Sequence, residues 1–195
     1  MRANAMLGGI LAVMISSPTL ADGIPKPEAY SASFLSDRTQ IVDVISSVGF
    51  YADQRRWDLV EAAFAEKAMI DYRSHSTAAA GQSEPQALTP REIVTAWQSQ
   101  LPGYLHTQHL ITNCIVAIDG ERATATSQVY ATHNLPNEGG DYWTFVGFYE
   151  HELQRTHAGW KITLMRANKL FELGNPQLPL IAAARVKAGT IATTP

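Results

Sequence analysis

The chain has 195 residues, of which 46% are hydrophobic and 17% charged, and this composition suits one globular domain with a substantial core. A net charge of −3 and scattered Lys and Arg residues give no sign of a nucleic-acid partner. Cys114 is the only cysteine, which excludes an internal disulfide and a cysteine-based metal cage.

The N-terminal residues are typical of a secretory signal. Arg2 supplies positive charge, an apolar segment runs from Ala5 to Ile15, and a small-residue cleavage site ends at Ala21. The apolar segment is shorter than the ~20 residues that a membrane span needs. We therefore expect residues 1–21 to be a signal peptide and the mature protein to be periplasmic or secreted, with no membrane attachment after cleavage. An uncleaved apolar anchor and a wrongly assigned start codon are the alternatives.

Residues 22–36 are rich in Pro, Ser and Ala and are predicted to form a linker. An apolar stripe at helical spacing predicts a helix from Asp37 to Asp53, with Asp37 as its N-cap. A second, short helix is expected from Trp57 to Glu66, and a short strand from Met69 to Tyr72.

Residues 74–88 are polar and rich in Ala and Gly, which predicts a loop. The next four residues, Thr89-Pro90-Arg91-Glu92, predict the start of a helix. Thr89 can cap this helix, Pro90 suits the first turn, and Glu92 completes a capping box. We expect Pro102-Gly103 to end the helix.

Beyond this helix the apolar residues alternate with period two, which is typical of strands. Four strands are expected, at Leu105–Ile118, Ala123–His133, Tyr142–Leu153 and Trp160–Lys169. Asp119-Gly120 predicts the turn between the first two. An Ala-rich tail follows over residues 175–195, with room for one more helix near Leu180–Lys187.

Helices followed by an antiparallel meander predict an α+β domain over residues 37–174. The helices are expected to cover one face of a curved, mainly antiparallel sheet. If that sheet closes partway, like a cone-shaped barrel, it leaves a pocket between sheet and helices.

Two histidines on neighbouring predicted strands, His109 and His133, are candidates for proton transfer near neutral pH. Both can point into one pocket only if odd residues pair with odd residues across the hairpin. A plain two-residue turn would put them on opposite faces, whereas a three-residue turn or a bulge at Gly120 would restore the match. The same parity puts Asn113 on the face of His109. His151 and His157 flank a later turn and are expected to be exposed.

Asp53, at the end of the first predicted helix, could fix the tautomer of one of these imidazoles. The alternative is an exposed acid paired with Arg55 or Arg56. An acid at this end opposes the helix dipole by ~0.3–1 kcal/mol, which slightly favours a functional role. Tyr72 either aims its hydroxyl into the pocket or is an ordinary core tyrosine. A metal held by Asp53 and the two histidines is a further alternative, although we expect neither a metal nor a cofactor.

Five stretches of this sequence carry a resemblance to a known family: Tyr51-Ala52-Asp53-Gln54-Arg55-Arg56-Trp57, Ile70-Asp71-Tyr72-Arg73-Ser74, His106-Thr107-Gln108-His109, Tyr130-Ala131-Thr132-His133 and Gly159-Trp160-Lys161. Over Asp37–Phe171 the chain resembles the scytalone dehydratases and their relatives in the SnoaL-like, nuclear transport factor 2-like superfamily. The resemblance implies a cone-shaped α+β barrel with the active site inside.

The same resemblance implies roles for individual residues. Asp53 would orient His109, His133 would be the second histidine, and Tyr72 would hold a water against a substrate carbonyl. Beyond these roles, we expect three further residues to bind substrate: Tyr51, Asn113 and Tyr149. The chain departs from the family at Ala52, where a tyrosine is usual, and near Gly147 and Tyr149, where a serine and an asparagine are usual.

The activity implied is a cofactor-independent, dehydratase-type elimination from a small cyclic substrate that carries hydroxyl or carbonyl groups. A ketosteroid-isomerase-like proton shuttle is the nearest enzymatic alternative. A non-catalytic periplasmic module that binds a small ligand is the alternative from another class, because fold does not determine function. The expected partner is a small-molecule substrate, and the family analogy adds a homo-oligomer.

Overall fold

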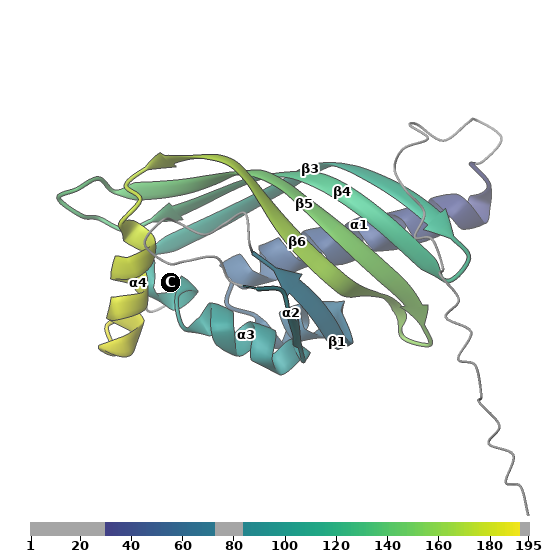
Figure 1. Ribbon diagram of the computed structural model, residues 1–195, viewed down its shortest axis with the longest axis horizontal. Coiled ribbons are helices and arrows are strands. Elements are labelled where there is room, and N and C mark those ends of the chain that lie inside the picture. The colour runs from purple at the N-terminus through teal and green to yellow at the C-terminus, as the bar shows by residue number, and fades with distance from the viewer. Residues whose placement is uncertain (1–29, 73–83, 192–195) are drawn as a thin grey trace, which may run out of the picture.

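The computed structural model describes residues 30–72 and 84–191, and Figure 1 shows their arrangement. The predicted signal at residues 1–21, most of the predicted linker and much of the predicted loop at residues 74–88 lie outside these ranges. The loop prediction is wrong at its described end, because residues 86–88 form a short edge strand. Within the two ranges, no helix has the length and apolar character that a bilayer crossing demands.

The first helix, α1 (Ala32–Asp53), begins inside the predicted linker rather than at Asp37. Its N-cap is Ser31, whose hydroxyl accepts a hydrogen bond from the Phe34 main-chain N–H at 3.1 Å. Asp37 lies within the helix and accepts hydrogen bonds from the guanidinium of Arg155 at 2.6 and 2.7 Å. The predicted N-cap is therefore wrong, because a serine upstream offers the same capping chemistry and leaves Asp37 for a tertiary ion pair.

The remaining helices agree better with the prediction. They are α2 (Trp57–Ala63), α3 (Pro90–Gln98), the short 3-10 helix η4 (Leu101–Gly103) and α4 (Leu178–Lys187). The capping box at α3 is confirmed, with the Thr89 hydroxyl accepting from the Glu92 N–H at 3.3 Å and the Glu92 carboxylate accepting from the Thr89 N–H at 2.8 Å.

Six strands form one curved mixed sheet in the order β2-β1-β6-β5-β4-β3. They are β1 (Phe64–Asp71), β2 (Gln86–Leu88), β3 (His106–Asp119), β4 (Arg122–Asn134), β5 (Tyr142–Thr156) and β6 (Gly159–Gly174). The α+β class and the mainly antiparallel sheet are confirmed, and the sheet stays open, with β2 and β3 at its edges. Helices α1, α2 and α3 lie on one side of the sheet and α4 lies at one end (Figure 1).

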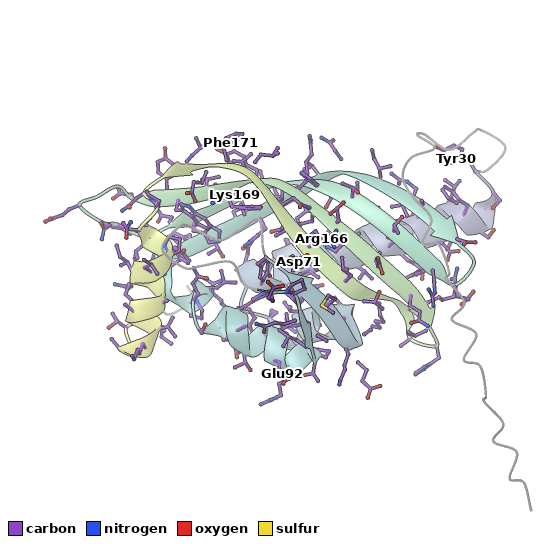
Figure 2. All side chains as sticks on the ribbon, in the orientation of Figure 1. Tyr30, Asp71, Glu92, Arg166, Lys169 and Phe171 are labelled. Atoms are coloured by element: carbon purple, nitrogen blue, oxygen red, sulfur yellow. The ribbon has the colours of Figure 1, made fainter. Side chains whose placement is uncertain are left out.

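One strand pair, β1 with β6, is parallel, whereas all other neighbours are antiparallel. An ion pair reinforces it, because Arg166 Nε donates to Asp71 Oδ2 at 2.8 Å, and Figure 2 shows both side chains beside this pairing. Asp71 is 1% exposed, so the guanidinium compensates a buried charge. Because β1 pairs with β6 as far as Asp71, Tyr72, which directly follows β1, lies beside the strands of the meander.

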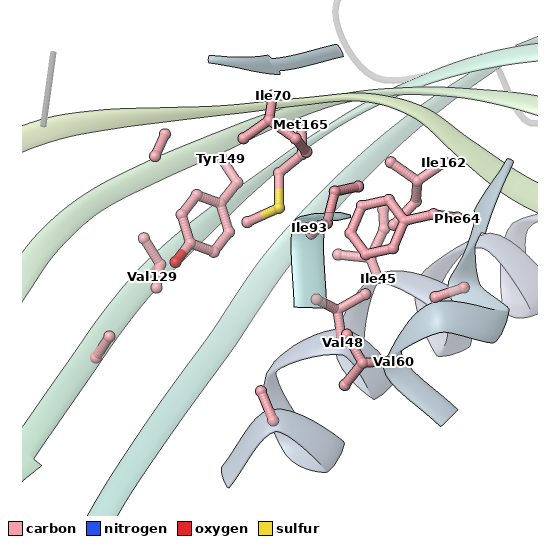
Figure 3. Close-up of a cluster of buried hydrophobic side chains, with 14 of the residues drawn as sticks. Ile45, Val48, Val60, Phe64, Ile70, Ile93, Val129, Tyr149, Ile162 and Met165 are labelled. Carbon is pink, nitrogen blue, oxygen red and sulfur yellow. The ribbon is translucent and has the colours of Figure 1, made fainter. Parts of the chain in front are cut away.

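The hydrophobic core lies between the sheet and α1, α2 and α3 (Figure 3). Ile45 and Val48 of α1 and Val60 of α2 face Phe64 and Met165 of the sheet, and all five side chains are at most 4% exposed. This apolar contact fixes α1 on the concave face, which positions the C-terminal end of α1 against β3.

A bulge in β3 determines which way His109 faces. Next to the turn, Asp119 pairs with Arg122, so odd residues oppose even ones. The register shifts between Thr112 and Ile115, and beyond that shift His109 pairs with Ala131. His109 and His133 therefore share the inner face, as expected, but the bulge lies at mid-strand and not at Gly120.

The same bulge overturns the expected position of Asn113. Its main chain has φ +52°, and its exposed side chain bonds Gln128 on the outer face. Cys114 takes the inward direction in its place and is half-buried. Asn113 is consequently not on the face of His109, because the extra residue reverses the alternation of side chains.

Candidate active site

The last residue of α1, Asp53, holds His109 of β3 through two contacts. Asp53 Oδ1 lies 2.7 Å from His109 Nδ1, and Asp53 Oδ2 accepts from the His109 main-chain N–H, also at 2.7 Å. The close approach of α1 to β3 depends on Gly49, where an added Cβ would lie 2.9 Å from the Cβ of His109. The carboxylate therefore fixes both the ring and the backbone of this histidine.

The charge of Asp53 is stabilised despite partial burial. Burial by itself would raise the pKa of this carboxyl group. The side-chain hydrogen bond and charge of His109, the His109 main-chain N–H and the Thr107 side chain oppose this effect, and together they lower the pKa below its ordinary value. Asp53 is thus an anion at neutral pH, and its negative charge faces the imidazole.

Arg55 supports this geometry and was not identified from the sequence. Its guanidinium donates to the main-chain oxygens of Ala52 at 2.9 Å and Leu101 at 2.7 Å, and to the Thr107 hydroxyl at 3.1 Å. It therefore ties the C-terminal end of α1 to β3 and η4 and places a positive charge where the helix dipole favours one. Because Arg55 bonds elsewhere and Arg56 pairs with Asp58, the alternative of an exposed, arginine-paired Asp53 does not hold.

The second histidine, His133, lies on β4 beside His109. The two ring centroids are 5.3 Å apart and the ring planes nearly perpendicular, at 85°. Its ring is 5% exposed and packs between Tyr104, at 4.8 Å, and Trp143, at 4.9 Å between centroids. Aromatic packing thus fixes His133 on the inner face, whereas a carboxylate fixes His109.

Both imidazoles line a cavity of about 470 Å³ between the sheet and the helices. Aromatic and aliphatic side chains make most of its wall: Val48, Ala52, Tyr72, Trp97, Leu101, Ile111, Trp143, Phe145, Tyr149 and Met165. Helix α4 and the residues before it close one end through Pro176, Pro179, Leu180 and Ala183. The described wall contains no Lys, Arg, Asp or Glu, so this cavity suits an uncharged ligand.

Residues 33–166 match the SnoaL-like domain. The chain belongs to the SnoaL-like domain family. Uncharacterized protein Rv2910c of Mycobacterium tuberculosis is 30% identical over 145 residues, which cover 73% of this chain and 91% of that protein. The predicted resemblance at the level of the superfamily is confirmed.

Two solved structures share the fold of this SnoaL-like chain. A Novosphingobium aromaticivorans protein provisionally designated scytalone dehydratase matches with a TM-score of 0.58 and 14% identity, over 72% of this chain and 89% of that one. Hexachlorocyclohexane dehydrochlorinase LinA type 2 matches with a TM-score of 0.58 and 16% identity, over 72% and 90%. At these identities the likeness shows the fold, which is nuclear transport factor 2-like.

The two tyrosines in the wall of the SnoaL-like cavity differ in their hydrogen bonding. Tyr72 accepts a hydrogen bond from Trp97 Nε1 at 3.0 Å, and burial raises its pKa to about 12. Tyr149 stacks on Phe145 at 6.2 Å between centroids, and burial raises its pKa further. Trp97 was not identified as a site residue from the sequence, and its indole N–H makes it a polar participant in the site.

Two of the predicted substrate-binding residues do not contribute to the described wall of this cavity. Tyr51 is half-buried with its ring 5.6 Å from that of Phe50, and Asn113 is exposed at the bulge. Tyr51 points elsewhere because it lies one residue before Ala52, which does line the cavity, and successive helical residues differ in direction by about 100°. The structure thus brings together Asp53, His109, His133, Tyr72 and Tyr149.

His151 contradicts its predicted exposure. It is 3% exposed and lies on the inner face of β5, whereas His157 at the turn is exposed. The strand continues past the expected end to Thr156, which places His151 well inside the sheet.

In the described ranges, no group of three or more His, Cys, Asp or Glu side chains is arranged to hold a metal ion.

Proposed function

We propose that this SnoaL-like protein is a lyase that removes a proton and a leaving group from a small cyclic substrate. The observation that carries the proposal is the Asp53–His109 pair, in which Oδ1 and Nδ1 are 2.7 Å apart and the imidazole lines a mainly apolar cavity. A carboxylate and an imidazole beside a mainly apolar pocket form a general base of the kind that abstracts protons from carbon next to a carbonyl group.

The contacts of His109 determine which nitrogen reacts. Because the Asp53 carboxylate is an acceptor, it favours the proton of the neutral imidazole on Nδ1. Nε2 then carries the lone pair and serves as the base toward a substrate in the cavity. When Nε2 takes the proton, the resulting imidazolium is stabilised by the adjacent negative charge.

His133 is proposed as the group that assists departure of the leaving group. Its ring centroid lies 5.3 Å from that of His109, so one small molecule can contact both imidazoles. A protonated His133 would transfer its proton to a departing hydroxide, which leaves as water. Tyr72 is proposed to polarise the substrate carbonyl, directly or through a water.

The cavity supports a substrate of limited size and polarity. A volume of about 470 Å³ lies within the range typical of small-molecule sites. Tryptophan, phenylalanine and tyrosine rings in the wall favour a flat cyclic molecule, and the lack of charged side chains in the described wall favours an uncharged one. The two similar folds named above, a dehydrochlorinase and a provisional dehydratase, also point to elimination chemistry.

The test is a turnover screen of hydroxylated cyclic ketones and halogenated rings with the wild type and His109→Ala. We expect a loss of about 10²–10⁴-fold in kcat/KM on removal of the base. His106→Ala is the matched control, since His106 is an exposed histidine of the same strand. Product analysis separates elimination from an isomerase reaction, because only elimination releases water or halide.

Two outcomes of this screen would overturn the lyase. Turnover that survives in His109→Ala would exclude the proposed base. Ligands that bind the wild type and His109→Ala equally, with no product from either, would make the protein a binding module.

Export is a separate proposal that depends on residues 1–21. Signal cleavage after Ala21 would yield a mature chain that begins at Asp22. Intact-mass analysis of the protein from a periplasmic extract tests this, and a full-length mass would contradict it.

A further inference from the structure

The hydroxyl group of Tyr149 has no hydrogen-bond partner among the described residues, although the side chain is buried. Tyr149 is 7% exposed, and its ring is held against Phe145 on the inner face of β5. It belongs to the wall of the cavity that also contains His109 and His133. Buried phenolic hydroxyls normally find a partner, so this one is expected to bond a molecule in the cavity.

Neighbouring contacts fix the direction of the Tyr149 side chain. Tyr149 pairs with Ser127 of β4 and with Ala167 of β6, so it lies in the middle of the sheet. Its ring also meets the His151 ring edge-on, with 5.9 Å between centroids. Figure 3 shows the phenol extending from β5 toward Val129 with its oxygen at the tip.

We propose that the Tyr149 hydroxyl donates a hydrogen bond to the substrate oxygen that becomes negatively charged when His109 removes a proton. Tyr149 would thus be a catalytic residue that stabilises an oxyanion. This inference rests on the proposed lyase function and adds a named donor to it. Oxyanion donors held in a dry pocket act strongly, because they are oriented before the charge develops.

The proposed elimination takes place in two steps. First, the C–H bond next to the carbonyl breaks, its proton goes to His109 Nε2, and the electron pair forms a C=C bond while the carbonyl electrons move to oxygen. Tyr149 donates its hydrogen bond to this enolate oxygen. Second, the oxygen reforms the carbonyl, the electron pair of the enolate C=C bond moves to form a new C=C bond to the carbon that carries the hydroxyl, and the C–O bond of that carbon breaks. The departing hydroxide takes a proton from His133 and leaves as water.

The environment keeps the Tyr149 phenol protonated, as a donor must be. Burial, followed by the nearby Tyr72 and Asp53, raises the pKa of Tyr149. Tyr72 differs because its oxygen already accepts from the Trp97 indole at 3.0 Å. The two hydroxyls therefore differ in their hydrogen bonding, and Tyr149 is the one for which no described protein group supplies a partner.

The first measurement is steady-state turnover of Tyr149→Phe on a substrate found in the screen described above. Removal of one oxyanion donor is expected to lower kcat by about 10²-fold with little change in KM. Tyr130→Phe is the matched control, because Tyr130 is 44% exposed on the outer face of β4. Equal thermal unfolding midpoints of the two variants would exclude a folding defect as the cause.

The second measurement needs no substrate and uses 4-nitrophenol, whose phenolate absorbs visible light. The wild type should favour the bound phenolate and so lower its apparent pKa, whereas Tyr149→Phe should lose about 10-fold or more in phenolate affinity. Affinity for the neutral phenol at low pH should stay the same. Equal phenolate binding by Tyr149→Phe and wild type, or no phenolate binding by the wild type, would overturn the inference.

The two measurements separate this inference from the lyase proposal. Loss of turnover in His109→Ala but not in Tyr149→Phe would leave the lyase intact and remove the role of Tyr149. Phenolate binding that depends on Tyr149, in a protein without turnover on any substrate, would remove the lyase and leave Tyr149 as the donor of an anion-binding cavity.

Discussion

Two inward-facing histidines, His109 on β3 and His151 on β5, show how differently one sheet can use the same side chain. His109 contacts a carboxylate at 2.7 Å and borders a cavity. His151 is 3% exposed, and its Nδ1 has no hydrogen-bond partner among the described residues. Burial lowers the pKa of His151 to about 3, so it stays neutral at physiological pH. The difference comes from what packs against each histidine, not from the strand that carries it.

Helix α1 explains why only one of the two is paired with an acid. Its C-terminal end delivers Asp53 to His109, whereas its earlier turns present the apolar side chains of Ile41 and Ile45 to the core. Burial without a carboxylate keeps His151 neutral, whereas the charged side chain of Asp53 faces the imidazole of His109. Four changes test this contrast, from the largest expected effect to the smallest.

Replacing Asp53 should remove the support that its carboxylate gives to proton abstraction by His109. Asp53→Asn is expected to lower kcat/KM by about 10²–10⁴-fold, because an amide can no longer hold the Nδ1–H tautomer or stabilise the imidazolium. Asp58→Asn, at an exposed carboxylate paired with Arg56, serves as the control and should keep full activity. Undiminished turnover of Asp53→Asn would remove the distinction between the two histidines.

Acid should destabilise the protein through His151. The unfolded chain binds a proton at this histidine near pH 6.5, whereas the native state does so only near pH 3. The unfolded state holds more protons within this window, so the free energy of unfolding falls by about 1.4 kcal/mol per pH unit as pH drops through it.

Denaturant unfolding at pH 7 and pH 5 measures this loss. His151→Leu should reduce the difference between the two pH values by about 2 kcal/mol relative to wild type. His157→Gln, at an exposed histidine, should leave it unchanged. The same acid sensitivity in His151→Leu and wild type would show that His151 becomes protonated without penalty.

Removing a second buried polar group that lacks a hydrogen-bond partner should stabilise the protein. Ser127 is 1% exposed, and its hydroxyl has no partner in the described ranges. Ser127→Ala is expected to raise the free energy of unfolding by about 1 kcal/mol, because it removes an unpaired buried hydroxyl. The contrasting variant is Thr144→Val, since the Thr144 hydroxyl lies 3.1 Å from that of Thr132 and its loss should lower stability by about 1 kcal/mol. If both variants gained stability, or both lost it, the expected difference between an unpaired and a paired buried hydroxyl would be contradicted.

The bulge that turns His109 inward should tolerate glycine well. Asn113 has φ +52°, a backbone conformation that glycine adopts without strain. Asn113→Gly is expected to change the free energy of unfolding by less than about 0.5 kcal/mol, whereas β-branched Asn113→Val should lower it by about 1 kcal/mol. Thermal unfolding of both variants checks this, and equal midpoints would argue against the bulge geometry.

The elements that depend on local chemistry were predictable from the sequence. The Thr89–Glu92 capping box, the four long strands of the meander and the C-terminal helix follow from side chains close together in the chain. The bulge at Asn113 was misplaced because a single asparagine inside an alternating strand pattern is a weaker signal than the Asp119-Gly120 turn, to which the bulge was assigned. Arg55 was missed as a site residue because its partners, Thr107 and Leu101, lie on other elements.

The sequence by itself determined the order of the helices and of the four meander strands, the alternation of inner and outer residues away from the bulge, and a resemblance to a family with a pocket, but it did not predict strand β2. Only the tertiary structure decided that Asp53 meets His109 across 56 positions of the chain, that His151 is buried without a carboxylate, and that Asn113 faces outward. The physical reason is distance along the chain. Periodicity and capping act over a few residues, whereas packing of α1 on a bulged strand brings together groups that no local pattern connects.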